Sequence, residues 1–209
     1  DAQVAADAGV DIIFAPSVDE MYPEGEPLIR ISSGELGNKF EGITRPGHFD
    51  GVLTVVNKLF NIVRPAAGSH EVNAYFGQKD AQQVLLVQRM IHDFNHDITL
   101  RPIAIVRDDD GLALSSRNEF LSEQEREAAL VISRTLALMR ENSLNRGFES
   151  IDLESARARI NSTEGVRLDY LELVDPSNFQ PPTADSERVL ALVAAYVGST
   201  RLIDNMDLL

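Results

Sequence analysis

Strand-like segments alternate with helix-like segments through the first half of the chain, and this alternation limits the fold more than any other feature of the sequence. The short apolar runs have the length of buried strands, whereas the longer segments repeat apolar residues at helical spacing. The expected helices span residues 2–9, 47–63 and 81–94, and the expected strands span 10–15, 28–32, 73–76 and 98–106. Strands separated by helices predict a parallel α/β sheet, and Pro102 predicts that the last strand lies at an edge or starts late.

The sequence pattern changes after Val106, where the chain becomes polar and then helical again. A capping box formed by Ser122 and Glu125 marks the start of a long helix. The expected elements of this half are helices over 122–142 and from 151 onward, and strands over 166–174, 188–197 and 200–203. Helices followed by a run of strands predict a small α+β domain. We therefore expect the chain to divide into residues 1–106 and 107–209.

Charge and hydropathy exclude several classes of partner. The chain has 19 basic and 33 acidic side chains and a net charge of −14, so we expect neither a nucleic acid nor an anionic membrane to bind it. No apolar run reaches the roughly 20 residues of a membrane helix, and no signal peptide is evident. These features predict a cytoplasmic protein.

The distribution of reactive residue types narrows the possible chemistry. The chain has no cysteine, which rules out disulfides, thiolate zinc sites and a cysteine nucleophile. All four histidines and all three lysines precede residue 100, so candidate catalytic groups concentrate in the first half. His92 and His96 have a spacing that suits a metal, but no third ligand is evident, and we expect no metal site.

The first candidate site is the polar loop Glu41–Gly51, which leads into the expected helix over 47–63. Gly47 leaves backbone N–H groups free for an anion, and Arg45 can make a two-point contact with a carboxylate or a phosphate. A Gly/Pro turn with a helix cap explains the same residues without a ligand. Spacing alone favours this simpler interpretation.

The second candidate site is Phe76–Gln83, where an expected strand runs directly into a helix. Ligands of parallel sheets bind at the carboxyl ends of the strands. Lys79 is therefore placed to bind a phosphate, and Gln83, one turn later, to hydrogen-bond a small polar substrate. A helix N-terminus with surface amides accounts for these residues equally well.

The third candidate site lies in Arg107–Asn118. The hydroxyls of Ser115 and Ser116 and the guanidinium of Arg117 can bind successive oxygens of a polyphosphate and stabilise charge on a leaving pyrophosphate. A loop with a helix cap is the alternative interpretation, and spacing favours it. The three acids Asp108–Asp110 are more typical of a solvated turn than of a Mg²⁺ site.

Taken together, these segments resemble the pantothenate synthetase (pantoate–β-alanine ligase) family. The stretches that carry the resemblance follow the family's order and span nearly the whole chain: Asp11–Gly25, Glu41–Val63, Phe76–Gln83, Pro102–Leu121 and Arg201–Asn205. The resemblance implies a Rossmann-like nucleotidyltransferase domain followed by a small α+β lid domain. It also implies ATP, pantoate and β-alanine as substrates, Mg²⁺ as cofactor, and a homodimer. In the implied reaction, ATP and pantoate form pantoyl adenylate and pyrophosphate, and β-alanine then displaces AMP to give pantothenate.

The resemblance further implies roles for individual residues. The catalytic residues that would hold the ATP phosphates are Lys79, Ser115, Ser116 and Arg117. The remaining ATP contacts would be Gly77 and Asp80 beside the ribose, and Val106 and Leu114 near the adenine. Pantoate would be bound by Gln83 and by an apolar wall of Val52, Val55 and Val56, and Arg45 is a further candidate for the same pocket.

The sequence departs from the family's pattern in three places. Family members normally begin with one or two further βα units, which carry a His-x-Gly-His motif and a second pantoate-binding Gln, so we expect a Rossmann-like domain that is incomplete at its N-terminus and a chain that alone lacks part of the ATP site. Residues 66–72 resemble a short loop insertion, and Gln78 stands where the family commonly has Glu. The alternative to a ligase is therefore a non-catalytic binding or dimerisation module. An adenylyltransferase for another acid is disfavoured, because Gln83 and the valine wall are kept.

Overall fold

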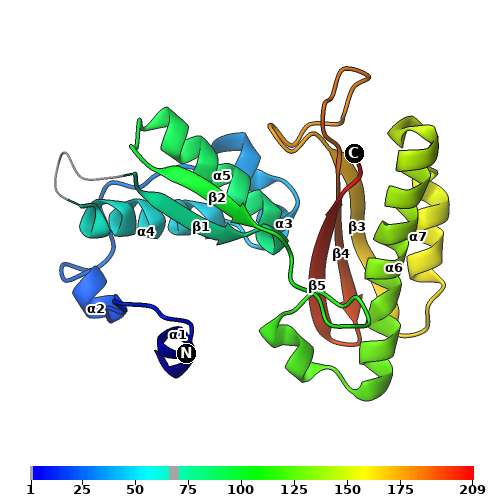
Figure 1. Ribbon diagram of the computed structural model, residues 1–209, viewed down its shortest axis with the longest axis horizontal. Coiled ribbons are helices and arrows are strands. Elements are labelled where there is room, and N and C mark those ends of the chain that lie inside the picture. The colour runs from blue at the N-terminus through cyan, green and yellow to red at the C-terminus, as the bar shows by residue number, and fades with distance from the viewer. Residues whose placement is uncertain (1, 66–70) are drawn as a thin grey trace. The chain divides into compact units, whose positions relative to one another are not determined.

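The computed structural model of the protein describes residues 2–65 and 71–209 (Figure 1). The chain divides into two compact units, Asp1–Ile31 and Ser32–Leu209. Each unit is described by itself below.

The first unit holds two short helices, α1 (Ala2–Asp7) and α2 (Val18–Met21). The strand expected at 10–15 is wrong, because this segment is irregular and Ile12 is 84% exposed. The strand expected at 28–32 is wrong as well. A strand is stable only when a neighbouring strand pairs with its backbone, and neither segment pairs with any strand that the structure describes.

The second unit opens with a parallel α/β arrangement. Strands β1 (Asn73–Gly77) and β2 (Thr99–Ile103) pair in parallel, as the alternation of strands and helices predicted. Helices α4 (His48–Val63) and α5 (Ala81–Asp93) pack against each other. Both helices begin and end within one residue of the expected bounds, because each has a regular apolar face and a clear signal at both ends.

Pro102 lies in an edge strand, as predicted. It pairs in register with Phe76, and the described sheet has two strands, so both are edges. The strand ends at Ile103 rather than at residue 106 because β1 ends at Gly77, level with Ile103, and offers no further backbone partner.

Two short turns, one short helix and one glycine bring the candidate segments together. The turn η1 (Gly34–Asn38) and the helix α3 (Glu41–Thr44) precede α4, and the turn η2 (Gln78–Asp80) joins β1 to α5. Gly47 caps α4 with a φ of 76°, which a residue without a Cβ adopts at no steric cost. This conformation lets the chain turn sharply from α3 into α4.

The rest of the second unit is α+β, as predicted. Its elements, in chain order, are η3 (Ser116–Phe120), α6 (Glu123–Arg146), η4 (Phe148–Ser150), α7 (Leu153–Asn161), β3 (Val166–Val174), β4 (Leu190–Val197) and β5 (Thr200–Asp207). The strands form an antiparallel sheet in the order β3-β4-β5, and α6 and α7 lie against one face of it (Figure 1).

The bounds of these elements follow local signals. Ser122 and the side chain three residues later form the expected capping box at the start of α6. The helix continues past its expected end to Arg146, where Gly147 stops it with a φ of 82°. Strand β5 also extends past its expected end, because Leu190 in β4 pairs with Asp207.

A single apolar core joins α6 and α7 to the antiparallel sheet. Its most deeply buried side chains include Leu130, Leu136, Ile160, Leu171, Val189 and Val193.

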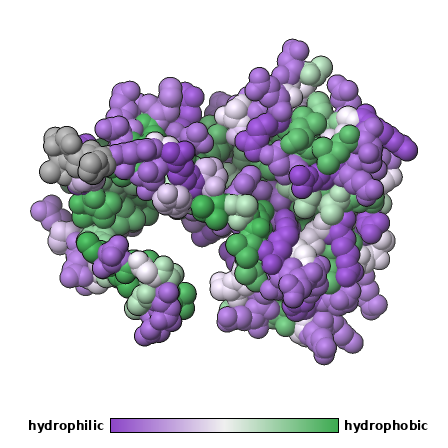
Figure 2. Space-filling view, viewed as in Figure 1, coloured by the Kyte–Doolittle hydropathy of each residue, from purple (hydrophilic) through white to green (hydrophobic). Residues whose placement is uncertain are grey.

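Hydrophilic side chains cover most of the face seen in Figure 2, which agrees with the net charge of −14. In the part of the chain that the structure describes, no helix combines the length and apolar character needed to span a bilayer. The expected insertion at 66–72 falls largely on residues 66–70, which lie outside the described residues.

Replacing Leu136 by Ala is expected to lower the free energy of unfolding by about 2–5 kcal/mol, because the side chain is 0% exposed and its truncation leaves a cavity. Leu138→Ala on the same helix is the matched control. Its side chain is 41% exposed, and the expected loss is below about 1 kcal/mol. Urea denaturation followed by circular dichroism measures both values. Equal losses would contradict the packing of α6 described above.

Candidate active site

A cleft opens in the second unit where α3, η2 and the start of α5 face β5. Its volume is about 40 Å³, so the cleft is narrow as it stands. Its polar lining residues are Glu41, Arg45, His48, Lys79, Asp80, Gln82, Gln83, Arg117, Tyr170, Asp204 and Asn205. Because β1 runs into η2, the cleft lies beyond the carboxyl end of a parallel strand, where α/β proteins bind ligands.

Three of the predicted ligand-binding cations, Arg45, Lys79 and Arg117, line this cleft. Among the described residues, none forms a hydrogen bond or an ion pair with the Lys79 ammonium or the Arg45 guanidinium. The Arg117 guanidinium makes one hydrogen bond within the described chain, from Nη1 to the carbonyl oxygen of Arg201 at 3.3 Å. The positive charge of these three side chains is therefore available to a ligand.

Two of the acids that line the cleft are neutralised by arginines. The Asp204 carboxylate accepts two hydrogen bonds from Arg107, at 2.7 and 2.9 Å. The Glu41 carboxylate accepts two from Arg201, at 2.6 and 2.8 Å. With these acids paired, the unpaired cations outnumber the remaining lining acid, Asp80, and the cleft favours an anionic ligand.

Arg201 is the centre of a polar network that ties α3 to the antiparallel sheet. It bonds Asp169 as well as Glu41, and the hydroxyl of Tyr170 donates to Glu41 Oε1 at 2.9 Å. Burial and the Glu41 carboxylate raise the pKa of Tyr170, which keeps the phenol protonated as a donor. Burial acts against the charge of Arg201, but its bonds to both carboxylates outweigh burial and raise the pKa of the guanidinium.

The two adjacent glutamines at the start of α5 have different environments. Gln82 is 4% exposed, and its Nε2 donates to the carbonyl oxygens of Leu36, at 2.7 Å, and Lys39, at 2.9 Å. Its Oε1 accepts from the backbone N–H of Glu41 at 3.1 Å. Gln83 lines the cleft, and no described residue bonds its amide. Gln82 therefore holds the segment before α4, whereas Gln83 is free to bind a ligand.

The predicted hydroxyl pair lies at the start of η3, on the segment that follows β2. Ser115 caps η3 by accepting a hydrogen bond from the backbone N–H of Arg117 at 3.3 Å. It also lines a second, smaller cavity, which shares Lys79 with the main cleft. Ser116 is exposed at the first position of η3. The structure thus brings Ser115, Arg117 and Lys79 to adjoining cavities.

Of the residues expected near the nucleoside, Asp80 lines the cleft, whereas Gly77, Val106 and Leu114 do not. The backbone N–H of Leu114 donates to the carbonyl oxygen of Val106 at 2.9 Å, and the two side chains are 47% and 60% exposed. They form an exposed apolar pair. Gly77 is exposed at the end of β1, and Asp80 lines the cleft.

The predicted valine wall lies on α4. Val52 and Val55 are half-buried, and Val56 is buried. They do not line the cleft, which α4 reaches through His48 and Phe49. Residues that are three, four or seven positions apart lie on the same face of a helix. Val52 and Val55 therefore lie on the same face of α4 as His48. Val56 lies on the same face as Phe49.

The three consecutive acids form the solvated turn that the sequence favoured. The N–H of Gly111 donates to the carbonyl oxygen of Asp108 at 2.9 Å. Arg126 binds the carboxylates of Asp108 and Asp110 and occupies oxygens that a metal would need. Across residues 2–65 and 71–209, no three His, Asp or Glu side chains are grouped to hold a metal ion.

His48 begins α4 and lines the cleft beside Arg45. Burial lowers the pKa of its imidazole, and the charge of Arg45 lowers it further, against smaller opposite effects of Asp80 and Glu41. The imidazole is therefore neutral at neutral pH and adds no charge to the anion site.

Sequence reasoning missed the residues that the antiparallel sheet contributes. Tyr170, Asp204 and Asn205 line the cleft although they lie far along the chain from Lys79. The stretch Arg201–Asn205 carried a signal through its resemblance to the family, but no spacing rule connects it to a particular partner. Tyr170 lies within a strand of alternating apolar residues and carried no signal.

The fold and this site define a nucleotidyltransferase-like α/β protein with a small C-terminal domain. A family model described as pantoate–β-alanine ligase matches residues 1–207. Pantothenate synthetase from Paenarthrobacter aurescens (strain TC1) is 50% identical, over 96% of this chain and 71% of that protein. The chain belongs to the pantoate–β-alanine ligase family.

Solved structures agree with this assignment. The crystal structure of pantothenate synthetase from Thermus thermophilus matches with a TM-score of 0.88 and 40% identity, over 99% of this chain and 73% of that one. Pantoate–β-alanine ligase from Francisella tularensis, solved in complex with β-γ ATP and β-alanine, matches with a TM-score of 0.74 and 36% identity, over 99% and 68%. These matches confirm the predicted fold class.

His48 is expected to titrate below the ordinary histidine pKa of 6.5 in an NMR titration, for the reasons given above. Arg45→Gln removes a nearby positive charge and is expected to raise this pKa. Arg64→Gln is the matched control, because Arg64 acts on half-buried His96, whose pKa should rise while that of His48 stays unchanged. Since the unfolded chain binds this proton more readily, stability falls as the pH drops through 6.5 toward the folded pKa. A His48 midpoint above 6.5 would contradict the burial of its imidazole.

Proposed function

We propose that this protein condenses pantoate with β-alanine through a pantoyl-adenylate intermediate. A carboxylate oxygen of pantoate attacks the α-phosphorus of ATP, the bond to the bridging oxygen breaks, and pyrophosphate leaves. The amine of β-alanine then attacks the acyl carbonyl, loses a proton and expels AMP, which gives pantothenate. The observation that carries this proposal is the convergence of Arg45, Lys79 and Arg117 in a cleft that also holds Gln83.

The choice of substrates draws on the family. The Francisella tularensis relative binds β-γ ATP and β-alanine, which supports the same two substrates here. Both pantoate and ATP are anions, and the unpaired cations of the cleft suit them. Membership of the ligase family favours an enzyme over the non-catalytic binding module that the sequence left open.

The proposed phosphate site consists of Lys79, Ser115, Ser116 and Arg117. Lys79 supplies its ammonium from η2, and Arg117 supplies its guanidinium from η3, so the two charges approach from the segments that follow β1 and β2. Donors that are held in place before the reaction stabilise charge as it develops on the leaving pyrophosphate. The bond from Arg117 to the carbonyl of Arg201 helps to hold one of them.

The nucleoside would lie along the same strand ends. We place the ribose beside Gly77 and Asp80, which flank Lys79. The adenine would contact Val106 and Leu114, whose exposed apolar side chains the backbone holds side by side. A flat base that covers these two side chains removes apolar surface from water, which favours binding.

Pantoate would bind deeper along α4 and α5. The amide of Gln83 can bond its polar groups, and Arg45 can pair with its carboxylate. The proposed apolar wall for the methyl groups consists of Val52, Val55 and Val56 on α4. In this position the carboxylate faces the α-phosphorus, and holding both reactants in line lowers the entropic part of the barrier.

Mg²⁺ would enter bound to the phosphates of ATP, because this ion keeps few protein ligands and prefers phosphate oxygens. The described residues include no metal-binding group of three side chains, and Arg126 occupies two of the three acids in the only Asp run. No step of the reaction is therefore assigned to the ion.

The remaining parts of the proposal concern organisation. Residues 1–106 would form the ATP- and pantoate-binding part, and residues 107–209 would form a lid over it. The cleft has lining residues from both parts, which supports this division. We also propose a cytoplasmic homodimer.

Lys79→Ala is expected to reduce pantoate-dependent exchange of pyrophosphate into ATP by at least about 100-fold, because it removes a charge that stabilises the leaving group. Lys58→Ala is the control, since Lys58 lies on α4 and does not line the cleft. Thermal melting checks that both variants fold. Near-normal exchange in Lys79→Ala would contradict the phosphate role.

Gln83→Ala is expected to raise the KM for pantoate about tenfold and to leave the KM for ATP within about twofold, because one substrate hydrogen bond is lost. Gln88→Ala provides the matched control, as Gln88 is exposed on the same helix. Steady-state kinetics with each substrate varied in turn measures the two constants. An equal rise in both would argue against a pantoate-specific contact.

A further inference from the structure

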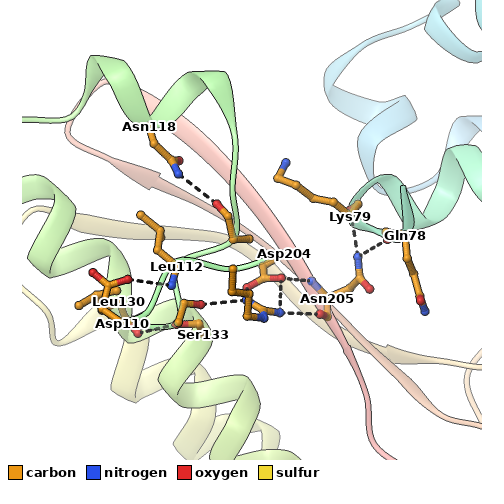
Figure 3. A network of polar contacts seen from close by, with 12 residues as sticks. Gln78, Lys79, Asp110, Leu112, Asn118, Leu130, Ser133, Asp204 and Asn205 are labelled. Atoms are coloured by element: carbon orange, nitrogen blue, oxygen red, sulfur yellow. Dashed lines mark hydrogen bonds and ion pairs between the residues drawn. The ribbon is translucent and has the colours of Figure 1, made fainter. Parts of the chain in front are cut away.

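Asn205, in β5, bonds the turn that carries Lys79 from the opposite wall of the cleft (Figure 3). Its side chain is buried, at 3% exposed, and its Nδ2 donates to the carbonyl oxygens of Gln78 and Lys79, both at 2.9 Å. An amide has two N–H donors, so this one side chain satisfies two consecutive backbone carbonyls.

These two bonds tie η2 to β5. Sheet pairing ends at Gly77, level with Ile103, so the carbonyls of Gln78 and Lys79 lie beyond the ladder between β1 and β2. A backbone carbonyl that loses its donor away from water is left without a hydrogen bond, which destabilises the conformation that holds it. Without Asn205, the turn would therefore rearrange or take up water.

Asn205 is itself held firmly. Its backbone pairs with Leu192 across the β4–β5 ladder. Arg107 binds the neighbouring Asp204 carboxylate through two hydrogen bonds and also donates to the carbonyl oxygen of Asn205 at 3.3 Å. The anchor of η2 is thus a buried position in a paired strand.

Lys79 has no comparable anchor of its own. No described residue bonds its ammonium, and Figure 3 shows its side chain extending away from Asn205. The backbone of η2 therefore sets the direction from which the ammonium reaches the cleft.

We propose that Asn205 is a positioning residue for ATP binding, which holds both carbonyls of η2 and so places the Lys79 ammonium against the phosphates. This inference rests on the proposed function, because it assumes that Lys79 binds ATP. Asn205 acts through Lys79 and needs no contact with the nucleotide.

A double-mutant cycle on the ATP dissociation constant tests this role by isothermal titration calorimetry. Asn205→Ala is expected to raise the constant about tenfold in the otherwise unchanged chain. In the Lys79→Ala background, the same substitution is expected to change it less than twofold, because the group that Asn205 places is gone. A purely structural loss would act equally in both backgrounds and would overturn the proposal.

Asn161→Ala is the matched control. Asn161 also bonds a backbone group, accepting from the N–H of Leu168 at 2.9 Å, but it does not line the cleft. It is expected to leave ATP binding within twofold. If Asn205→Ala does not fold, as judged by thermal melting, Asn205→Ser keeps one donor and is expected to raise the constant by a smaller factor that again disappears without Lys79.

The outcomes separate the two proposals. If Lys79→Ala leaves ATP binding unchanged, the phosphate role fails and the positioning role fails with it. If Lys79→Ala weakens binding and neither Asn205 variant does, the phosphate role stands and the positioning role is overturned.

Discussion

Paired arginines and carboxylates join the antiparallel sheet to the α/β part, and the cleft depends on them. Arg201 binds Glu41 on α3, and Arg107 binds Asp204 on β5, each through two hydrogen bonds. The side chains of Arg201 and Glu41 are each 14% exposed, so breaking the pair would leave a largely buried charge without a partner. The same pairs neutralise two acids of a strongly acidic protein in the cleft that we propose binds an anionic ligand.

Local elements of the fold were predictable from the sequence, whereas strands without partners were not. Helices α4 and α5 have regular apolar faces and clear ends, and most of their bounds follow from that pattern. The segments at 10–15 and 28–32 are apolar enough for strands, yet they are irregular. A strand depends on a neighbour elsewhere in the chain, which a local pattern does not contain.

The candidate site divides in the same way. The sequence identified Lys79 and Gln83 as candidates because they lie where a strand runs into a helix. It identified Arg45 because that residue lies in a loop that leads into a helix. Asn205 and Tyr170 reach the cleft only because β3 and β5 pair with β4 and present one face to η2 and α3. Such contacts join residues more than a hundred positions apart, and no spacing along the chain encodes them. The roles of all these residues in catalysis remain predictions.

The paired ends of β1 and β2 determine where the chain leaves the sheet to form the site. Gly77 pairs with Ile103, so the chain leaves both strands at the same height before it reaches Lys79 on one side and Arg117 on the other. A shift of one residue in the pairing of β1 with β2 would move the segment after one strand by about 3.3 Å. The side chains of the shifted strand would turn to the opposite face of the sheet. The distance between the two cations that we propose to bind one polyphosphate therefore depends on the register of this backbone pairing.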